Sequence, residues 1–281
     1  MPKTVLVTGC STGIGRATAL YFREQGWNVV ATVRSLEGER ELQQLERMAL
    51  VAMDVRDTAS VTRAVDEAVR ACGQVDAVIN NAGYSLFGLF EEAPETSWRD
   101  QIETNLYGTI HVMRAMLPHF RARRSGVFVN VTSLVAVAGF PLNSYYTASK
   151  WGVEGITEAL VHELKPYGIR FKLVQPGLTK TAAHAKYDAQ KHEHIPDYDG
   201  FREAIVAKVR PDPDSAGSQK ASEVAAEIYA ATLDESPRLR YPLGAVTQAF
   251  TNLRREQPET AFLDLVSQQT AVDPSHVPKL R

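Results

Sequence analysis

Short runs of β-branched and apolar residues alternate with longer amphipathic stretches through the first 180 residues. The short runs predict strands at residues 4–8, 28–33, 49–53, 77–80, 127–131 and 170–174. The stretches between them predict helices at residues 14–25, 36–47, 59–71, 95–121 and 145–165. Alternation at this spacing requires βαβ crossovers, which build a parallel sheet with helices on both faces. No repeat or linker rich in Pro, Gly or Ser interrupts the pattern, so we expect one α/β domain over residues 1–281.

The first expected strand runs into a glycine-rich turn, and the first helix follows at once. Glycines permit a tight turn and let backbone N–H groups approach a pyrophosphate at a helix N-terminus, where the helix dipole favours anions. The spacing is G-x-x-x-G-x-G rather than G-x-G-x-x-G. Its place between a strand and a helix predicts a dinucleotide-binding turn. The residues of this turn are Gly9, Ser11, Thr12, Gly13, Ile14 and Gly15.

The end of the second expected strand indicates which dinucleotide binds. An acidic side chain there accepts a hydrogen bond from the ribose 2′-hydroxyl of NAD, whereas an arginine attracts the 2′-phosphate of NADP. This chain has Val33 where the acid is expected, and Arg34 follows it. An arginine at a strand end is often only solvated, but no carboxylate stands beside this one. We therefore expect NADP(H) to be preferred over NAD(H), with Ser11 as a second phosphate contact.

Polar and small residues also follow the third and fourth expected strands. These are Asp54-Val55 and Asn80-Asn81-Ala82-Gly83. Open α/β sheets bind ligands at the carboxyl ends of their strands. Asp54 could accept a hydrogen bond from an adenine amino group there, and Ala82-Gly83 could let the backbone pass close to a ribose. Asn, Asp and Gly are common turn residues, so each motif alone is equally consistent with a turn.

A tyrosine and a lysine stand four residues apart in the helix expected at 145–165. At this spacing Tyr146 and Lys150 share one helix face. A free tyrosine has a pKa of roughly 10 and transfers protons poorly at neutral pH. A nearby cation favours the phenolate and lowers that pKa. The spacing alone is also typical of an ordinary amphipathic helix with both side chains in solvent.

Taken together, these motifs resemble the short-chain dehydrogenase/reductase family over roughly residues 3–180. They occur in the family's order: T-G-x-x-x-G-x-G at 8–15, D-V at 54–55, N-N-A-G at 80–83, Asn105, Ser133, Y-x-x-x-K at 146–150 and Pro176-Gly177. The resemblance implies a Rossmann-type, doubly wound parallel sheet of about seven strands in the order 3-2-1-4-5-6-7. Less specifically, residues 7–16 and 240–244 are similar to those of 17β-hydroxysteroid and retinol dehydrogenases.

The resemblance also implies roles for individual residues. Tyr146 would be the general acid in carbonyl reduction and the base in alcohol oxidation. Lys150 would lower the pKa of Tyr146 and bind the nicotinamide ribose, and Ser133 would hydrogen-bond the carbonyl oxygen. Asn105 would hold a water that links Lys150 to solvent. Tyr145 and Thr132 compete for two of these roles, but only Tyr146 stands four residues before the lysine.

The segment after the sixth expected strand would contact the nicotinamide and the substrate. In the family, the turn at Pro176 and Gly177 passes the nicotinamide, and the candidates for its carboxamide are Leu178 and Thr181, with Thr179 less favoured. Residues 182–217 correspond to the variable substrate lid and show no regular pattern. Its histidines, His184, His192 and His194, lack a cysteine or paired carboxylate to complete a metal site, so no metal is expected.

The C-terminal part predicts a helix at 222–233, a short strand at 240–243 and a helical extension over residues 245–281, with helices near 245–255 and 259–266. The extension covers either the substrate cleft or an oligomer edge, or it is a surface helix pair with a frayed tail. The resemblance to hydroxysteroid and retinol dehydrogenases, together with apolar residues near the strand ends, implies a lipophilic, steroid- or retinoid-like substrate, although several of these residues fit the core equally well. The apolar residues are Leu86, Phe87, Leu89, Phe90, Val135, Val137, Phe140 and Leu142.

Composition limits the remaining function classes. A net charge of −2 gives no sign of a nucleic-acid surface. With two cysteines, no signal peptide and no apolar run of the ~20 residues that span a bilayer, we expect a cytoplasmic protein. The leading hypothesis is an NADP(H)-dependent ketone or alcohol oxidoreductase, and the alternative is a non-catalytic dinucleotide sensor or scaffold. A sugar-nucleotide epimerase fits the chain length and glycine spacing poorly. A homodimer or homotetramer is expected by analogy.

Overall fold

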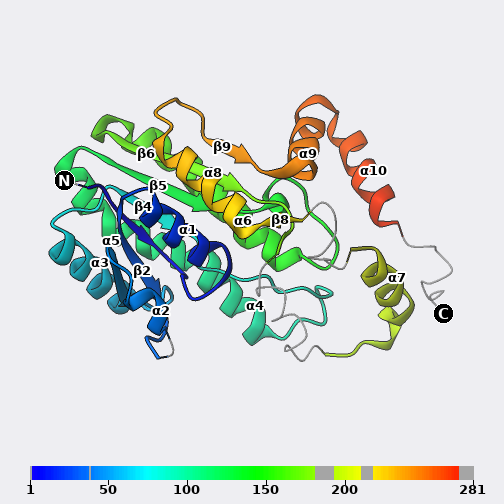
Figure 1. Cartoon of the computed structure of the whole chain (residues 1–281). Coiled ribbons are helices and arrows are strands. Elements are labelled where there is room, and N and C mark those ends of the chain that lie inside the picture. Colours follow the sequence, from blue (N-terminus) through cyan, green and yellow to red (C-terminus); the bar gives the residue numbers. More distant parts are fainter. Residues whose placement is uncertain (1, 38, 181–192, 210–217, 272–281) are drawn as a thin grey trace.

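The computed structural model describes residues 2–37, 39–180, 193–209 and 218–271. A sheet of seven parallel strands lies at its centre, in the order β3-β2-β1-β4-β5-β6-β9 (Figure 1). The strands are β1 (Thr4–Val7), β2 (Asn28–Val33), β3 (Met48–Ala52), β4 (Ala77–Asn80), β5 (Gly126–Val131), β6 (Ile169–Gln175) and β9 (Arg240–Pro242). The expected strand order is confirmed. The last strand is β9 because β7 (Thr179–Lys180) and β8 (Gln219–Lys220) form a separate two-stranded sheet.

Alternate side chains of the strands feed two cores on opposite faces of the sheet. Val5 and Val7 of β1 belong to one core, and Leu6 belongs to the other. Strands buried on both faces read as continuous apolar runs, which explains the pattern of the sequence. The first core is covered by α1 (Gly13–Glu24) and α8 (Ala221–Leu233), and the second by α3 (Thr58–Cys72), α5 (Gly108–Arg123) and α6 (Ser144–Leu164) (Figure 1).

Two helices differ from the sequence prediction. The helix predicted at 36–47 is too long, because only α2 (Arg40–Gln43) is helical there. The chain turns at Arg47, which has φ 61°, to enter β3. The helix expected at 95–121 is interrupted: α4 (Glu95–Ile102) passes through a π-helical turn, Glu103–Tyr107, into α5. Such turns insert one extra residue and are frequent at functional sites.

Three helices lie beyond the carboxyl ends of the strands (Figure 1). The prediction that residues 182–217 lack regular structure is wrong at α7 (Asp199–Val209). In this helix Ile205 packs against Phe87 and Leu142. The helices expected near 245–255 and 259–266 are confirmed as α9 (Gly244–Glu256) and α10 (Glu259–Thr270). A core of Phe250, Phe262, Val266, Val137 and Ala138 joins α9 and α10 to the segment after β5. Within the described ranges, no helix has the length and apolar character needed to cross a membrane.

Candidate active site

A cavity of about 880 Å³ lies at the carboxyl ends of the strands. It includes the point between β1 and β4 where the strand order reverses, which is where open α/β sheets bind ligands. The sequence-predicted residues that line it are Gly9, Ser11, Thr12, Gly13, Ile14, Arg34, Asp54, Val55, Asn81, Ala82, Gly83, Ser133, Tyr146, Lys150, Pro176, Gly177 and Leu178. Gly15 and Asn105 are buried behind the lining. Thr181 lies outside the described residues.

The glycine-rich turn packs directly on the Asn81-Ala82 turn. Gly9 has φ 73°, and a Cβ on it would lie 2.9 Å from the Cα of Ala82. A Cβ on Gly15 would lie 2.2 Å from the carbonyl oxygen of Gly9. The Thr8 hydroxyl accepts hydrogen bonds from the backbone N–H groups of Asn81 (3.0 Å) and Ala82 (2.9 Å). These contacts bring the turns after β1 and β4 together, which explains why the sequence places glycine at both positions.

The N-terminus of α1 faces the cavity and fits an anion. Its N-cap residue, Thr12, makes no side-chain capping hydrogen bond, and no acidic residue occurs in the first turn. The backbone N–H groups of this turn therefore lack a side-chain acceptor, and the helix dipole favours a negative group beside them. The exposed Arg34 lines the same cavity. None of the ion pairs among the described residues involves Arg34.

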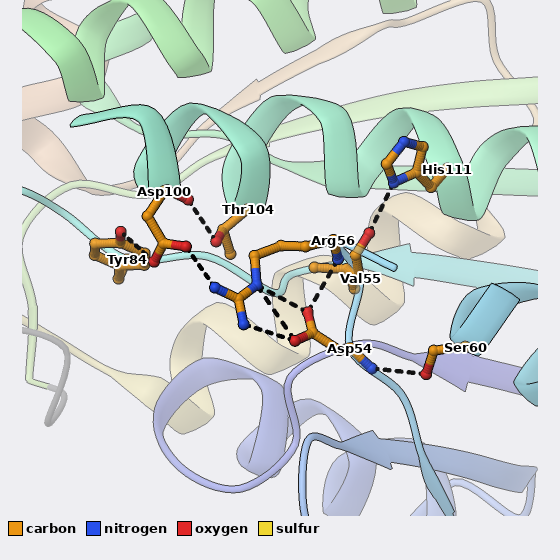
Figure 2. Close-up of polar contacts among 8 residues, drawn as sticks. All are labelled: Asp54, Val55, Arg56, Ser60, Tyr84, Asp100, Thr104 and His111. Atoms are coloured by element: carbon orange, nitrogen blue, oxygen red, sulfur yellow. Dashed lines mark hydrogen bonds and ion pairs between the residues drawn. The ribbon is translucent and has the colours of Figure 1, made fainter. Parts of the chain in front are cut away.

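A second arginine at this end is already neutralised (Figure 2). Arg56 pairs with Asp54 at 2.7 Å and also with Asp100 of α4, which accepts a 3.1 Å hydrogen bond from the Tyr84 hydroxyl. The Arg56 guanidinium holds the pKa of the Asp54 carboxyl below its usual range. Sequence analysis did not identify Arg56 or Tyr84, both of which line the cavity. The only local signal for this contact is the arginine two residues after the aspartate.

Helix α6 presents Tyr146 and Lys150 to the end of β5. The Tyr146 phenol shares a hydrogen bond with the Ser133 hydroxyl. The Lys150 ammonium donates to the carbonyl oxygen of Val131 at 2.8 Å and lies 5.8 Å from the centroid of the Tyr146 ring. The structure therefore brings the predicted tyrosine, lysine and serine together on one wall of the cavity.

Burial shifts both titratable groups of this wall. Burial raises the pKa of Tyr146, and the hydrogen bond with Ser133 opposes that rise. Burial lowers the pKa of Lys150 to about 8, and the charge of Glu154 opposes that change. A raised pKa keeps the phenol protonated at neutral pH but makes it a weaker acid, so burial by itself opposes proton transfer. The expected lowering of the Tyr146 pKa by Lys150 stays a prediction.

Asn105 supports this wall from the π-helical turn. Its side-chain amide donates to the carbonyl oxygen of Tyr84 at 2.9 Å and to the Ser149 hydroxyl at 3.0 Å. Ser149 in turn donates to the carbonyl oxygen of Tyr146 at 2.7 Å. A Cβ on Gly83 would lie 2.8 Å from Oδ1 of Asn105. Asn105 thus connects the turn after β4 to the helix of Tyr146, and Ser149 is a contact that the sequence analysis missed.

The two competing residues have other partners. The Tyr145 ring stacks between Phe90, at 4.9 Å, and Trp98, at 5.3 Å between ring centroids. Its hydroxyl donates to the carbonyl oxygen of Phe90, and Tyr145 does not line the cavity. The buried hydroxyl of Thr132 donates to Glu154 at 2.8 Å. Neither group is directed at the hydroxyl pair of Ser133 and Tyr146.

The far end of the cavity is mostly apolar and involves the C-terminal extension. Its apolar lining consists of Leu134, Val135, Phe140, Val246 and Phe250, and its polar lining includes Asn143, Lys208 and Gln269. Of the apolar residues expected near the substrate, only Val135 and Phe140 line the cavity. Phe87 and Leu142 pack under α7 instead, because that helix needs an apolar surface to cover. The sequence analysis left open whether the C-terminal extension covers the cleft or an oligomer edge, and Val246 and Phe250 of α9 and Gln269 of α10 line the cavity.

The histidines expected in the lid do not form a described metal site. His184 and His192 lie outside the described residues, and the exposed His194 contacts Asp199 at 2.8 Å. Over the ranges that the structure describes, no group of three His, Cys, Asp or Glu side chains could hold a metal ion.

Comparison with known proteins identifies sequence relatives of the chain. The family model described as short chain dehydrogenase matches residues 3–192. An uncharacterized oxidoreductase of Schizosaccharomyces pombe is 32% identical over 82% of this chain and 96% of its own length. A 3-ketodihydrosphingosine reductase of Bacteroides thetaiotaomicron is 37% identical over 63% of this chain and 64% of its own length.

Solved structures are similar over most of the fold. A short-chain dehydrogenase from Streptomyces avermitilis has a TM-score of 0.79 and 30% identity, over 95% of this chain and 94% of that one. ElxO with NADP bound has a TM-score of 0.71 and 29% identity, over 86% of this chain and 96% of that one. Both the sequence and the fold comparisons therefore point to one family.

Proposed function

The chain belongs to the short chain dehydrogenase family, and we propose that it is an NADP(H)-dependent oxidoreductase that interconverts a ketone or aldehyde with an alcohol. The observation that carries this proposal is the meeting of Ser133, Tyr146 and Lys150 on one wall of a cavity. The N-terminus of α1 and Arg34 line other parts of the same cavity. The cavity thus combines a proton-transfer group with an anion site.

The cofactor's phosphates fit the α1 end of the cavity. The glycine-rich turn would hold the pyrophosphate at backbone N–H groups that lack a side-chain cap. Arg34 and Ser11 would contact the 2′-phosphate, since Arg56 is paired with two carboxylates whereas none of the ion pairs between described residues involves Arg34. ElxO, which resembles this chain, has NADP bound. The preference for NADP(H) over NAD(H) is therefore part of the proposal.

The remaining cofactor contacts follow the cavity lining. Asp54 and Val55 would lie beside the adenine, and Asn81, Ala82 and Gly83 beside a ribose. The nicotinamide end would be held by Lys150 and Tyr146 and by the turn of Pro176, Gly177 and Leu178. When bound, the cofactor supplies the hydride chemistry. Every other contribution to the reaction comes from the protein's own side chains.

Proton transfer is assigned to Tyr146. In reduction its phenol donates a proton to the carbonyl oxygen, and in oxidation the phenolate accepts one. Ser133 donates a hydrogen bond to the same oxygen as negative charge develops on it. Lys150 stabilises the phenolate electrostatically, and Asn105 would hold a water that connects Lys150 to solvent.

The substrate is proposed to be lipophilic and steroid- or retinoid-like. The apolar lining from Val135, Phe140, Val246 and Phe250 supports this class. One relative is a reductase of 3-ketodihydrosphingosine, as its name states. In this proposal α7 and the extension of α9 and α10 close the substrate end. A homodimer or homotetramer and a cytoplasmic location stay predictions.

The test is oxidation of NADPH against NADH over a panel of steroid, retinoid, aliphatic and quinone carbonyls. We expect turnover of at least one lipophilic carbonyl, with NADPH the better cofactor. Binding of NADPH without turnover of any carbonyl would favour the alternative, a non-catalytic NADP(H)-binding sensor or scaffold. Turnover with NADH alone would contradict the cofactor assignment but leave the reaction class intact.

A further inference from the structure

A buried carboxylate continues the row of Tyr146 and Lys150 along α6. Glu154 stands four residues after Lys150, and its side chain is only 8% exposed. It does not line the cavity. Burying a carboxylate is costly unless hydrogen bonds and an opposite charge compensate it. The contacts of Glu154 therefore need an explanation.

The carboxylate joins the ends of three strands. Its Oε1 accepts hydrogen bonds from the Thr132 hydroxyl at 2.8 Å and from Nε2 of Gln175 at 3.0 Å. Its Oε2 accepts one from Nε of Arg240 at 2.8 Å. Thr132 follows β5, Gln175 ends β6, and Arg240 begins β9. One side chain of α6 thus fixes three neighbouring strands of the sheet.

The same contacts reach residues of the proposed site. Thr132 immediately precedes Ser133, and Gln175 immediately precedes Pro176. Along α6, Lys150 bonds the carbonyl oxygen of Val131 and Glu154 bonds Thr132, while Tyr146 shares a hydrogen bond with Ser133. Three successive residues at the end of β5 are therefore each held by the same helix. A shift of Glu154 would move the serine relative to the tyrosine.

Among the described residues, few charged or titratable side chains surround Lys150. On α6 itself, the titratable side chains that face it are Tyr146 and Glu154. The end of β5 contributes the uncharged carbonyl of Val131, and the π-helical turn contributes the uncharged amide of Asn105 beside Gly83. From β9, Arg240 faces Glu154 and also pairs with the outer carboxylate of Glu158 at 2.5 Å. Arg240 is thus the counter-ion of Glu154, and it is the first residue of the stretch 240–244 that resembles hydroxysteroid and retinol dehydrogenases.

We propose that Glu154 is a positioning residue for the proposed reaction: its carboxylate holds the ends of β5 and β6 against α6 and keeps Lys150 in its cationic form. This rests on the proposed function for its catalytic consequence. The contacts of Glu154 and the effect of its charge on Lys150 do not depend on that proposed function. The negative charge opposes the burial that lowers the pKa of Lys150 to about 8. Without it, Lys150 loses its proton at a lower pH.

The deciding variant is Glu154→Gln, compared with Glu158→Gln. The amide keeps the size of the side chain but loses the charge, and its NH2 group faces a hydrogen-bond donor. The control removes the exposed carboxylate on the other side of Arg240. The pKa of Lys150 is measured by NMR of [13Cε]lysine-labelled protein, with the resonance assigned by its loss in Lys150→Met. The pH dependence of kcat/KM is measured in parallel.

We expect the Lys150 titration and the alkaline limb of kcat/KM to move to lower pH in Glu154→Gln and to stay in place in Glu158→Gln. We also expect kcat to fall by about tenfold or more, because small displacements of reacting groups are costly. Glu154→Asp, which keeps the charge, should restore the titration. Thr132→Val should lower kcat without moving the Lys150 titration, since it removes the hydrogen bonds of the Thr132 hydroxyl to Glu154 and to the carbonyl oxygen of Val174 but leaves the charge of Glu154 in place.

A purely structural role predicts a lower melting temperature with an unchanged Lys150 titration and pH profile, and that result overturns the proposal. If Glu154→Gln does not fold, the proposal stands or falls on Thr132→Val and Glu154→Asp. An unchanged kcat in Thr132→Val together with a displaced titration in Glu154→Asp would refute it. Failure of the proposed function is distinguishable, because a wild type without turnover still reports the Lys150 titration.

Discussion

The ammonium of Lys150 lies 5.8 Å from the centre of the Tyr146 ring and is fixed there by a 2.8 Å hydrogen bond to the carbonyl of Val131. The lysine is therefore held by the sheet rather than by the tyrosine. The ammonium keeps further N–H donors for other partners. In the proposed function Tyr146 donates the proton and Lys150 controls it, so each residue has its own prediction.

Replacing Tyr146 by Phe should lower kcat by about a thousandfold or more, because the acid and base of the reaction is lost. Binding of NADPH, followed by its fluorescence, should change little. Tyr145→Phe is the matched control, since that ring stacks between Phe90 and Trp98 outside the cavity. Substantial residual activity in Tyr146→Phe would refute the assignment.

The double variant Val33→Asp with Arg34→Ala should shift the ratio of kcat/KM values from NADPH towards NADH by about tenfold or more. A carboxylate at 33 would bind a free ribose 2′-hydroxyl and repel a 2′-phosphate. Arg34→Ala alone should weaken NADPH binding with less effect on NADH. An unchanged ratio in the double variant would contradict the cofactor assignment.

Carbonyl reduction should lose rate as pH rises through about 8. Burial lowers the pKa of Lys150 to about 8, so the lysine is cationic below that pH and neutral above it. Burial raises the pKa of Tyr146, so the phenol remains protonated across the same range. The pH profile of kcat/KM for reduction checks this. A rate that stays level to pH 10 would show that the lysine charge is not needed.

The same shift affects stability in the opposite sense. The pKa of Lys150 is lower in the folded protein than the roughly 10.4 of an unfolded lysine. Between these two values the unfolded chain binds more protons, so this group stabilises the fold as pH rises from about 8 towards 10. The unfolding free energy of the wild type minus that of Lys150→Met should therefore increase over that range, because methionine does not titrate. Chemical denaturation at several pH values measures it.

Glu92→Gln should loosen α7. The buried Glu92 carboxylate accepts a 3.0 Å hydrogen bond from the backbone N–H of Ile195 and pairs with Arg202 of α7. The variant removes the ion pair between Arg202 and a residue outside α7, and it leaves Arg202 ion-paired only within its own helix, with Asp199, among the described residues. Hydrogen exchange across α7 should become about tenfold faster. Glu91→Gln is the control, because the exposed Glu91 accepts its hydrogen bond from the Tyr198 hydroxyl, outside α7, and equal exchange in both variants would refute a specific role for Glu92.

Sequence alone was sufficient for the framework of this protein. The alternation of buried runs and amphipathic stretches predicts the parallel sheet, because strands covered on both faces must be apolar throughout. The spacing of Tyr146 and Lys150 and the glycines at 9 and 15 is set by local helix and turn geometry, so those residues were identified without contacts. These signals depend on backbone geometry within a few positions along the chain, whereas the packing of Gly9 on Ala82 is a tertiary contact.

Only the tertiary structure decided which distant groups pair. Arg240 meets Glu154 across 86 positions, and Arg56 meets Asp100 across 44, and no local pattern specifies such partners. At the π-helical turn, the side-chain amide of Asn105 donates hydrogen bonds to Tyr84 and Ser149, which stand 21 and 44 positions away. The apolar end of the cavity likewise required α7, α9 and α10 to pack on loops far away in sequence. Local propensity determines where the elements form, whereas burial and charge compensation between them determine what the site can bind.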